Sequence, residues 1–125
     1  MNETIDTIMN RASLRKYEET PIDPGHRELI LKSAWRAPTA GNMMLYSVIE
    51  VTDQGIKDTL SETCDHQPFI AKAPMVLIFL ADVTRWYDYY KTCGVAEWQA
   101  DQGKEYAGPD EADFLLACND AVIAA

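Results

Sequence analysis

A short basic segment near the N-terminus holds the residues best suited to binding an anion. Arg11, Ser13 and Arg15 alternate with other residues in the sequence RASLR. If this segment is extended, side chains at every second position share one face, at intervals of roughly 6–7 Å. Two guanidinium groups and a hydroxyl on one edge suit a phosphate, because guanidinium groups bind oxyanions through paired hydrogen bonds. A solvated basic turn between two helices is the alternative, and these residues alone leave both interpretations open.

A second segment with binding potential, RAPTAGN, follows a predicted helix and precedes a predicted strand. Pro38 ends the helix, because the residue before a proline is pushed out of the helical conformation. Ala40 and Gly41 are small enough for the backbone to approach a ligand closely. Thr39 and Asn42 offer side-chain hydrogen bonds. Asn42 is equally typical of a plain turn after glycine.

These two segments, together with a third, resemble the FMN-dependent nitroreductase family. The third segment is QPFIAKAP at positions 67–74, followed by a predicted strand. The three occur in the family's order, and the resemblance runs from about residue 3 to the end of the chain. It implies an α/β (α+β) fold of the nitroreductase type, with three layers in which helices flank a central mixed or antiparallel sheet. Only part of that fold is expected in this chain.

The resemblance also implies roles for individual residues. Arg11, Ser13 and Arg15 are expected to hold the FMN phosphate and ribityl chain. The loop at 39–42 is expected to approach the flavin ring or the ribityl chain, and Gln67 to hydrogen-bond the flavin. Gln67 could instead be a solvated loop residue before a proline, and this alternative remains open.

The function implied by the resemblance is that of an FMN-dependent oxidoreductase. Hydride would pass from NAD(P)H through FMN to nitroaromatic or quinone-like acceptors by a ping-pong mechanism, in a homodimer with the flavin at its interface. The flavin would carry the chemistry, so no catalytic side chain is expected, and the sequence holds no serine-hydrolase, zinc-protease or P-loop motif. The alternative is a flavin- or nucleotide-binding module without turnover, or an incomplete fragment. The sequence does not distinguish NADH from NADPH.

Composition restricts the partners and the compartment. Twenty acidic residues against 11 Lys and Arg give a net charge of −9, which argues against nucleic acid as the main partner. The longest apolar run, 75–81, is far shorter than the roughly 20 residues of a membrane-spanning helix. Three widely spaced cysteines and an N-terminus without an apolar signal predict a reducing, cytoplasmic setting. No metal site is expected, because Cys64 and His66 lack further ligands.

Hydrophobic periodicity and capping residues predict an alternation of helices and strands. Asp23 and Pro24 give the clearest helix start, because they supply a side-chain cap and a first-turn proline. The polar, glycine-containing stretch 93–108 is interpreted as a mobile loop or lid. Helices are predicted at 3–10, 23–36, 54–64, 83–92 and from 110 onward, and strands at 46–52 and 75–80.

The predicted last helix bears on domain organisation. Five of its residues repeat at helical spacing: Phe114, Cys118, Ala121, Val122 and Ala125. The pattern has no stop signal, and two strands make a thin sheet for such a domain. We therefore expect a single nitroreductase-like domain over residues 1–125 that is truncated at its C-terminal end.

Aromatic residues cluster on the predicted helix 83–92, where the sequence reads WYDYY. Such a cluster could stack on a nicotinamide or on a small aromatic acceptor. It could also pack against the sheet or against a dimer partner, and the packing interpretation is favoured.

Overall fold

The computed structural model describes residues 2–125, which form two compact units. The first unit contains residues 2–21 and Thr52–Val76. The second contains Ile22–Val51 and Leu77–Ala125. The single domain over 1–125 expected from the sequence stays a prediction.

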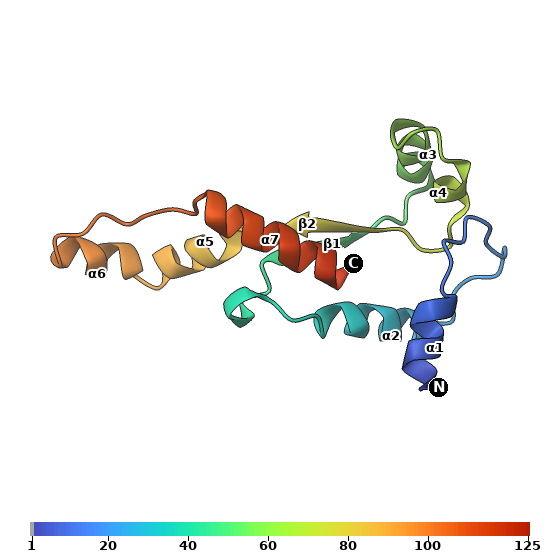
Figure 1. Cartoon of the computed structure of the whole chain (residues 1–125). Helices are drawn as coiled ribbons and strands as arrows, with labels where there is room; N and C mark the ends of the chain where they lie inside the picture. Colours follow the sequence, from blue (N-terminus) through green and yellow to red (C-terminus); the bar gives the residue numbers. More distant parts are fainter. Residues whose placement is uncertain (1) are drawn as a thin grey trace. The chain divides into compact units, whose positions relative to one another are not determined.

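The first unit consists of three helices, α1 (Glu3–Asn10), α3 (Gln54–Thr63) and α4 (Pro68–Lys72). α3 begins where Asp53 predicts, because its carboxylate accepts the backbone N–H of Ile56 at 2.9 Å. α3 and α4 pack against each other (Figure 1). The side chain of Lys57 on α3 is buried and donates to the carbonyl of Ala73, just after α4, at 3.1 Å.

The short helix α4 has no counterpart in the sequence prediction. Pro68 supplies its first residue, a position at which proline costs no hydrogen bond. Five residues are too few to show the helical period, so hydrophobic spacing could not reveal it. Ser61 on α3 fixes its start, because the backbone N–H of Gln67 donates to the Ser61 carbonyl at 2.8 Å and the Ser61 hydroxyl donates to the Gln67 carbonyl at 3.0 Å.

The second unit is built on an antiparallel pair of strands, β1 (Tyr46–Glu50) and β2 (Leu77–Ala81). Tyr46 lies opposite Ala81, and Glu50 lies opposite Leu77. The long helix α7 (Glu111–Ala124) packs on this sheet and on α2 (Pro24–Trp35) (Figure 1). Helices around a small antiparallel sheet confirm the mixed α/β (α+β) class.

The core of the second unit joins α2, β1 and α7. Its buried members are Ala34, Tyr46, Ala121 and Ala124, and the Tyr46 hydroxyl donates to the Ala34 carbonyl at 2.9 Å. Small residues on both helices let the backbones approach the tyrosine ring closely. Burial of the hydroxyl is therefore compensated by a hydrogen bond, as buried polar groups require.

The buried face of α7 contains only part of the set of residues that repeat at helical spacing. The buried residues are Ala117, Asp120, Ala121 and Ala124. Phe114 and Val122, two of the residues that repeat at helical spacing, are 52% and 75% exposed. The helix is apolar on nearly every side, so hydrophobicity alone does not select the packed face, and close packing selects the alanines.

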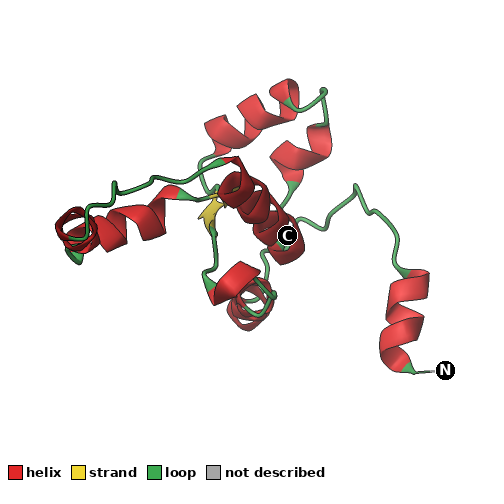
Figure 2. Cartoon of the chain, turned by 60° about the vertical axis from the view of Figure 1, so that its left-hand side comes forward, coloured by secondary structure: helices red, strands yellow, loops and turns green. Residues whose placement is uncertain are grey.

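The stretch predicted as a mobile loop contains a helix. α5 (Thr84–Thr92) is followed by α6 (Val95–Asp101), and both are visible as helical segments in Figure 2. Gly94 makes the break between them with φ of 77°, a conformation that side chains disfavour. The glycines of this stretch therefore mark the ends of a helix as well as a loop, which occupies 104–110.

Candidate functional site

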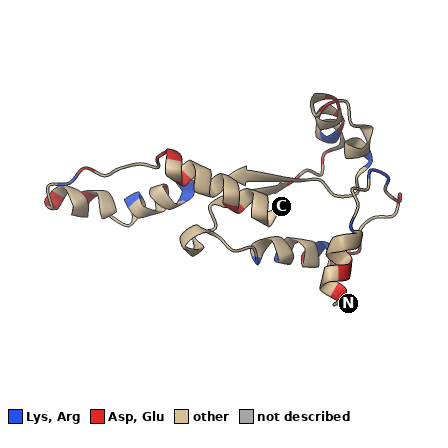
Figure 3. Ribbon diagram, viewed as in Figure 1, with Lys and Arg blue, Asp and Glu red and all other residues tan. Residues whose placement is uncertain are grey.

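The basic segment after α1 is non-helical and exposed. Arg11 ends α1 with extended dihedral angles, φ −62° and ψ 141°, and residues 11–18 form neither helix nor strand. Lys and Arg residues mark this segment in Figure 3. Among residues 2–125, no ion pair engages Arg11 or Arg15, and no hydrogen bond engages the Ser13 hydroxyl. The donors of this segment are thus available to an external anion.

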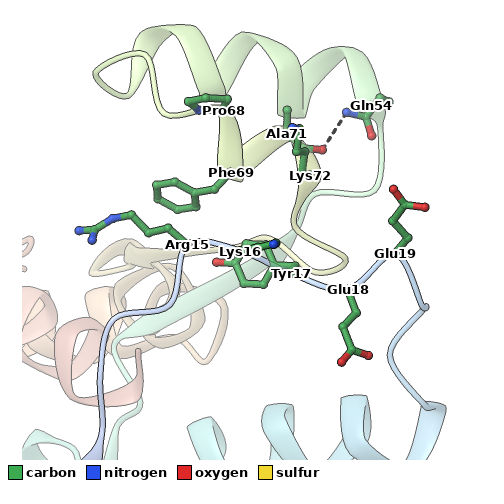
Figure 4. Close-up of a pocket in the computed structure, with 10 residues that line it drawn as sticks. All are labelled: Arg15, Lys16, Tyr17, Glu18, Glu19, Gln54, Pro68, Phe69, Ala71 and Lys72. Carbon is green, nitrogen blue, oxygen red and sulfur yellow. Dashed lines mark hydrogen bonds between the residues drawn. The ribbon is translucent and has the colours of Figure 1, made fainter.

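A cavity of about 860 Å³ lies where this segment meets α3 and α4 within the first unit (Figure 4). The Arg15 guanidinium lies 5.8 Å from the centre of the Phe69 ring, within cation–π range. The ring of Tyr17 lies 6.4 Å from that of Phe69. The cavity therefore combines aromatic surface with a positioned cation. Its lining residues are Arg15, Lys16, Tyr17, Glu18, Glu19, Gln54, Pro68, Phe69, Ala71 and Lys72.

The charges around this cavity have both signs. Arg15, Lys16 and Lys72 contribute three cations, whereas Glu18 and Glu19 contribute two carboxylates. An anion is therefore favoured at the Arg15 end more than in the cavity as a whole. The arrangement suits a ligand with one anionic group and a flat apolar body.

Gln67 stands immediately before α4, with its backbone held by Ser61 on both its N–H and its C=O. Its side-chain amide makes no hydrogen bond with any residue in 2–125. A half-buried amide on a fixed backbone can both donate to and accept from a polar ring edge. This geometry is compatible with the ligand role expected for Gln67.

The loop that contains residues 39–42 belongs to the second unit and has an unusual backbone. Gly41, Asn42 and Met44 all adopt the left-handed region, with φ of 56°, 56° and 51°. Such conformations are costly for residues with a side chain, and they persist where surrounding contacts determine them. The Thr39 hydroxyl accepts the N–H of Met44 at 3.1 Å and closes the turn from within.

Asp120 is the principal residue that the sequence prediction missed. Its buried carboxylate, 3% exposed, accepts the N–H of Ala40 at 3.0 Å and that of Leu45 at 3.2 Å. The available signal was a single acidic residue in the largely apolar run FLLACNDAVIAA of the last helix. A buried carboxylate in such a run needs hydrogen-bond donors. The amino-acid sequence does not show which backbone N–H groups supply them.

The aromatic cluster of α5 has a packing role within the second unit. Trp86 donates its indole N–H to the carbonyl of Met43. Its ring lies 5.7 Å from that of Tyr89 and 5.8 Å from that of Tyr90, between ring centres. Arg85, next to it, donates to the carbonyl of Met44. These contacts support the packing interpretation and connect α5 to the loop before β1.

The predicted site residues therefore fall into two groups. Arg11, Ser13, Arg15 and Gln67 lie in the first unit, and only Arg15 lines the cavity beside α4. The loop 39–42 lies in the second unit. No group of three or more metal-binding side chains occurs within the described part of the chain. No helix in residues 2–125 is both long and apolar enough to span a bilayer.

The fold of this chain is similar to that of solved structures that include a nitroreductase. NfrA2 of B. megaterium superposes with a TM-score of 0.84 and 29% identity, over 99% of this chain and 47% of that chain. NfrA1 nitroreductase from B. subtilis superposes with a TM-score of 0.81 and 27% identity, over 98% of this chain and 47% of that chain. These similarities confirm the predicted fold type.

Sequence comparison identifies the family. Residues 8–125 match the sequence model of the Nitroreductase family, and the chain belongs to this family. It is 30% identical over 125 residues to an "FMN reductase (NADPH)" of Bacillus subtilis strain 168, a match that covers 100% of this chain and 47% of that protein. The chain spans about half the length of this relative. The family resemblance drawn from three sequence segments is confirmed.

Proposed function

We propose that this chain forms part of an FMN-dependent oxidoreductase that uses NAD(P)H. Its relatives carry names such as "FMN reductase (NADPH)" in Bacillus subtilis and "NADPH-flavin oxidoreductase" in Vibrio harveyi. The observation that carries the proposal is the exposed segment at 11–15, where two guanidinium groups without ion pairs flank a hydroxyl in a chain of net charge −9. Uncommitted cations in an acidic chain favour an anionic ligand.

The donors of this segment fit the phosphate of FMN. Arg11 and Arg15 each present a planar fork of N–H groups, and Ser13 adds a hydroxyl between them. Phe69 restrains the Arg15 side chain by its cation–π contact, which reduces the ordering needed on binding. Ala12 adds no charge between the two arginines, so this cradle would hold its phosphate with two guanidinium groups.

The remaining site residues would orient the flavin. We assign Gln67 to hydrogen-bond the flavin and the loop of Thr39, Ala40, Gly41 and Asn42 to approach the ring or the ribityl chain. Gly41 lacks a side chain where the loop turns, which leaves room for close approach. Bound FMN would supply hydride transfer between NAD(P)H and an acceptor. The protein would supply orientation and a face shielded from water.

We further propose that the active form is a homodimer in the cytoplasm. α7 exposes large apolar side chains on the faces away from its alanine stripe, and a helix that is apolar all round is normally covered. A second copy of the chain is the proposed cover. The exposed apolar residues of this helix are Phe114 (52%), Leu115 (63%), Leu116 (41%), Val122 (75%) and Ile123 (54%).

The cofactor assignment is tested by visible absorption after the purified chain is incubated with FMN and desalted. The wild-type chain is expected to retain the flavin band. Arg15→Ala is expected to lose it while far-ultraviolet circular dichroism stays unchanged. Lys104→Ala is the matched control, because it removes an exposed cation from the loop after α6. A colourless wild-type chain would refute FMN binding by residues 1–125 alone, and full FMN occupancy in Arg15→Ala would refute the phosphate assignment.

The reaction is tested on the flavin-loaded protein. Anaerobic addition of NADPH or NADH should bleach the flavin, and the faster donor defines the preference. Nitroaromatic or quinone acceptors should then restore the colour. Parallel lines in double-reciprocal plots at several donor concentrations would support a ping-pong order. A flavin that no nicotinamide bleaches would favour the alternative of a binding module without turnover.

A further inference from the structure

In the loop between α2 and β1, side chains hydrogen-bond to both the N–H and the C=O groups of two consecutive peptides. The peptide between Met44 and Leu45 donates its N–H to Asp120 at 3.2 Å, while its C=O accepts from Arg85. The preceding peptide, between Met43 and Met44, donates its N–H to Thr39 at 3.1 Å, while its C=O accepts from Trp86. Two consecutive peptide planes are therefore fixed in orientation.

The two charged members of this arrangement come from different helices. Asp120 lies on α7 and reaches the N–H side of the loop, where it also accepts from Ala40 at 3.0 Å. Arg85 lies on α5 and reaches the C=O side. Both charges act on Tyr46: burial is the main cause that raises its pKa, Asp120 raises it further, and Arg85 opposes the shift. The carboxylate and the guanidinium thus flank the start of β1.

The contacts of Asp120 and Arg85 with this loop, which we call the clamp, account for the backbone conformation of the loop. Asn42 and Met44 hold left-handed conformations that a free loop would leave. A carboxylate accepts two N–H groups at once, whereas the amide of an asparagine at 120 would turn one of its own N–H groups toward a backbone N–H. The carboxylate is therefore specifically suited to this position.

We infer that Asp120 and Arg85 form a positioning pair that fixes the 39–45 loop in the conformation that meets the flavin. Neither residue is assigned a direct contact with the cofactor, and both act through the peptide between Met44 and Leu45. The link to flavin rests on the proposed function. The clamp itself rests on the hydrogen bonds of the second unit.

Hydrogen exchange tests the clamp without any cofactor. Asp120→Asn is expected to speed exchange of the Leu45 amide by about tenfold, the effect of losing its buried hydrogen bond. Arg85→Gln is expected to speed the same exchange by a smaller factor, because Arg85 holds only the C=O side of that peptide. The Ala40 amide should respond only to Asp120→Asn. Glu111→Gln is the control on α7, because this exposed carboxylate makes no hydrogen bond with any residue in 2–125. Unchanged Leu45 exchange in both variants would overturn the clamp.

Flavin titration tests the functional link. Asp120→Asn and Arg85→Gln are expected to weaken FMN binding about tenfold and to alter the visible circular dichroism of bound flavin, which a general loss of stability would leave unchanged. Glu111→Gln should match the wild type. Wild-type affinity and dichroism in both variants, despite faster exchange, would overturn the positioning role. If the wild-type chain binds no FMN, residues 1–125 do not hold the cofactor alone, and exchange at Leu45 decides the clamp.

Arg85→Gln keeps the inference testable if Asp120→Asn does not fold. The Arg85 side chain is exposed, so its replacement leaves the core intact. Thermal unfolding of each variant, recorded beside the exchange data, separates local release of the loop from global loss of structure. Faster exchange at Leu45 with an unchanged melting temperature supports the pair.

Discussion

The hydroxyl of Tyr87 on α5 donates a hydrogen bond to Oδ2 of Asp113 in the first turn of α7, at 2.5 Å. The same Oδ2 accepts the backbone N–H of Asp110 at 3.1 Å. The bond to Asp113 is the main cause that raises the pKa of Tyr87 to about 12. In turn, Tyr87 is the main cause that lowers the pKa of Asp113, followed by the Asp110 backbone. A neutral phenol and an ionised carboxylate thus join two helices of the second unit.

The pair predicts how stability depends on pH. Asp113 has a lower pKa folded than unfolded, so its contribution is present above about pH 4 and is lost as the pH falls through the folded value. Tyr87 has a higher pKa folded than unfolded, so its contribution is present below about pH 10 and is lost as the pH rises toward the folded value. Stability should therefore be greatest between these limits.

Tyr87→Phe should lower the melting temperature by a few degrees at neutral pH and flatten both limbs of the pH profile. Tyr90→Phe is the control, because the Tyr90 hydroxyl bonds to no residue in the described chain. Thermal denaturation across the pH range measures both variants. A Tyr87→Phe profile parallel to that of the wild type would show that the hydrogen bond does not couple to stability.

Lys57→Met tests a buried cation in the first unit. Lys57 is 9% exposed and donates to the carbonyl of Ala73, whose residue is 8% exposed. Methionine retains the apolar stem but leaves that carbonyl without its donor, at a cost of about 1–3 kcal/mol. Urea unfolding measures the loss. Lys32→Met, at an exposed lysine paired with Glu28, should change the free energy of unfolding by less than about 0.5 kcal/mol.

Local signals made much of the secondary structure predictable. Asp23 and Pro24 fix the start of α2, and Asp53 fixes that of α3, because a cap acts on neighbouring N–H groups. The face of α7 could not be predicted in the same way. Its packing depends on the distance between backbones, which favours Ala117 and Ala121 over the larger Phe114.

The candidate site was predictable where adjacent residues define it. The exposed segment that carries Arg11 and Arg15 follows from charge and spacing within a few positions. The hydrogen bond from the Ala40 N–H to Asp120 joins residues 80 positions apart and depends on the placement of α7 against the loop. No pattern of neighbouring residues in the sequence predicts that placement. The left-handed turn at Gly41 was signalled by glycine, whereas no glycine marks the same conformation at Met44.

Salt provides a second test of the phosphate cradle. Arg11 is exposed, so its attraction for an anion is screened as the Debye length falls from about 10 Å at 0.1 M salt to about 3 Å at 1 M. FMN binding should weaken several-fold over this range. Arg11→Ala should bind more weakly at low salt and show a smaller salt dependence, whereas Lys104→Ala should keep the wild-type slope. Equal slopes for wild type and Arg11→Ala in fluorescence titrations would exclude Arg11 from the cradle.

Glycine substitutions separate strain in the 39–45 loop from strain elsewhere. Gly41 and Gly103 both have positive φ, 56° and 69°, and a Cβ at either meets no atom closer than 3.6 Å. Alanine should therefore cost a similar 1–2 kcal/mol at each, roughly the penalty of the left-handed region. Only Gly41→Ala should also weaken FMN binding, because only that loop is assigned to the flavin.

Gly108→Ala is the neutral control for this pair, because its Cβ enters open space and its φ lies outside the left-handed region. Chemical denaturation and flavin titration of the three variants give the comparison. If Gly103→Ala weakens FMN binding as much as Gly41→Ala does, the weaker binding reflects lower stability alone. Strain at residue 103 would then act on FMN binding as strongly as strain in the 39–45 loop. A selective loss in Gly41→Ala would instead tie the left-handed turn to the cofactor.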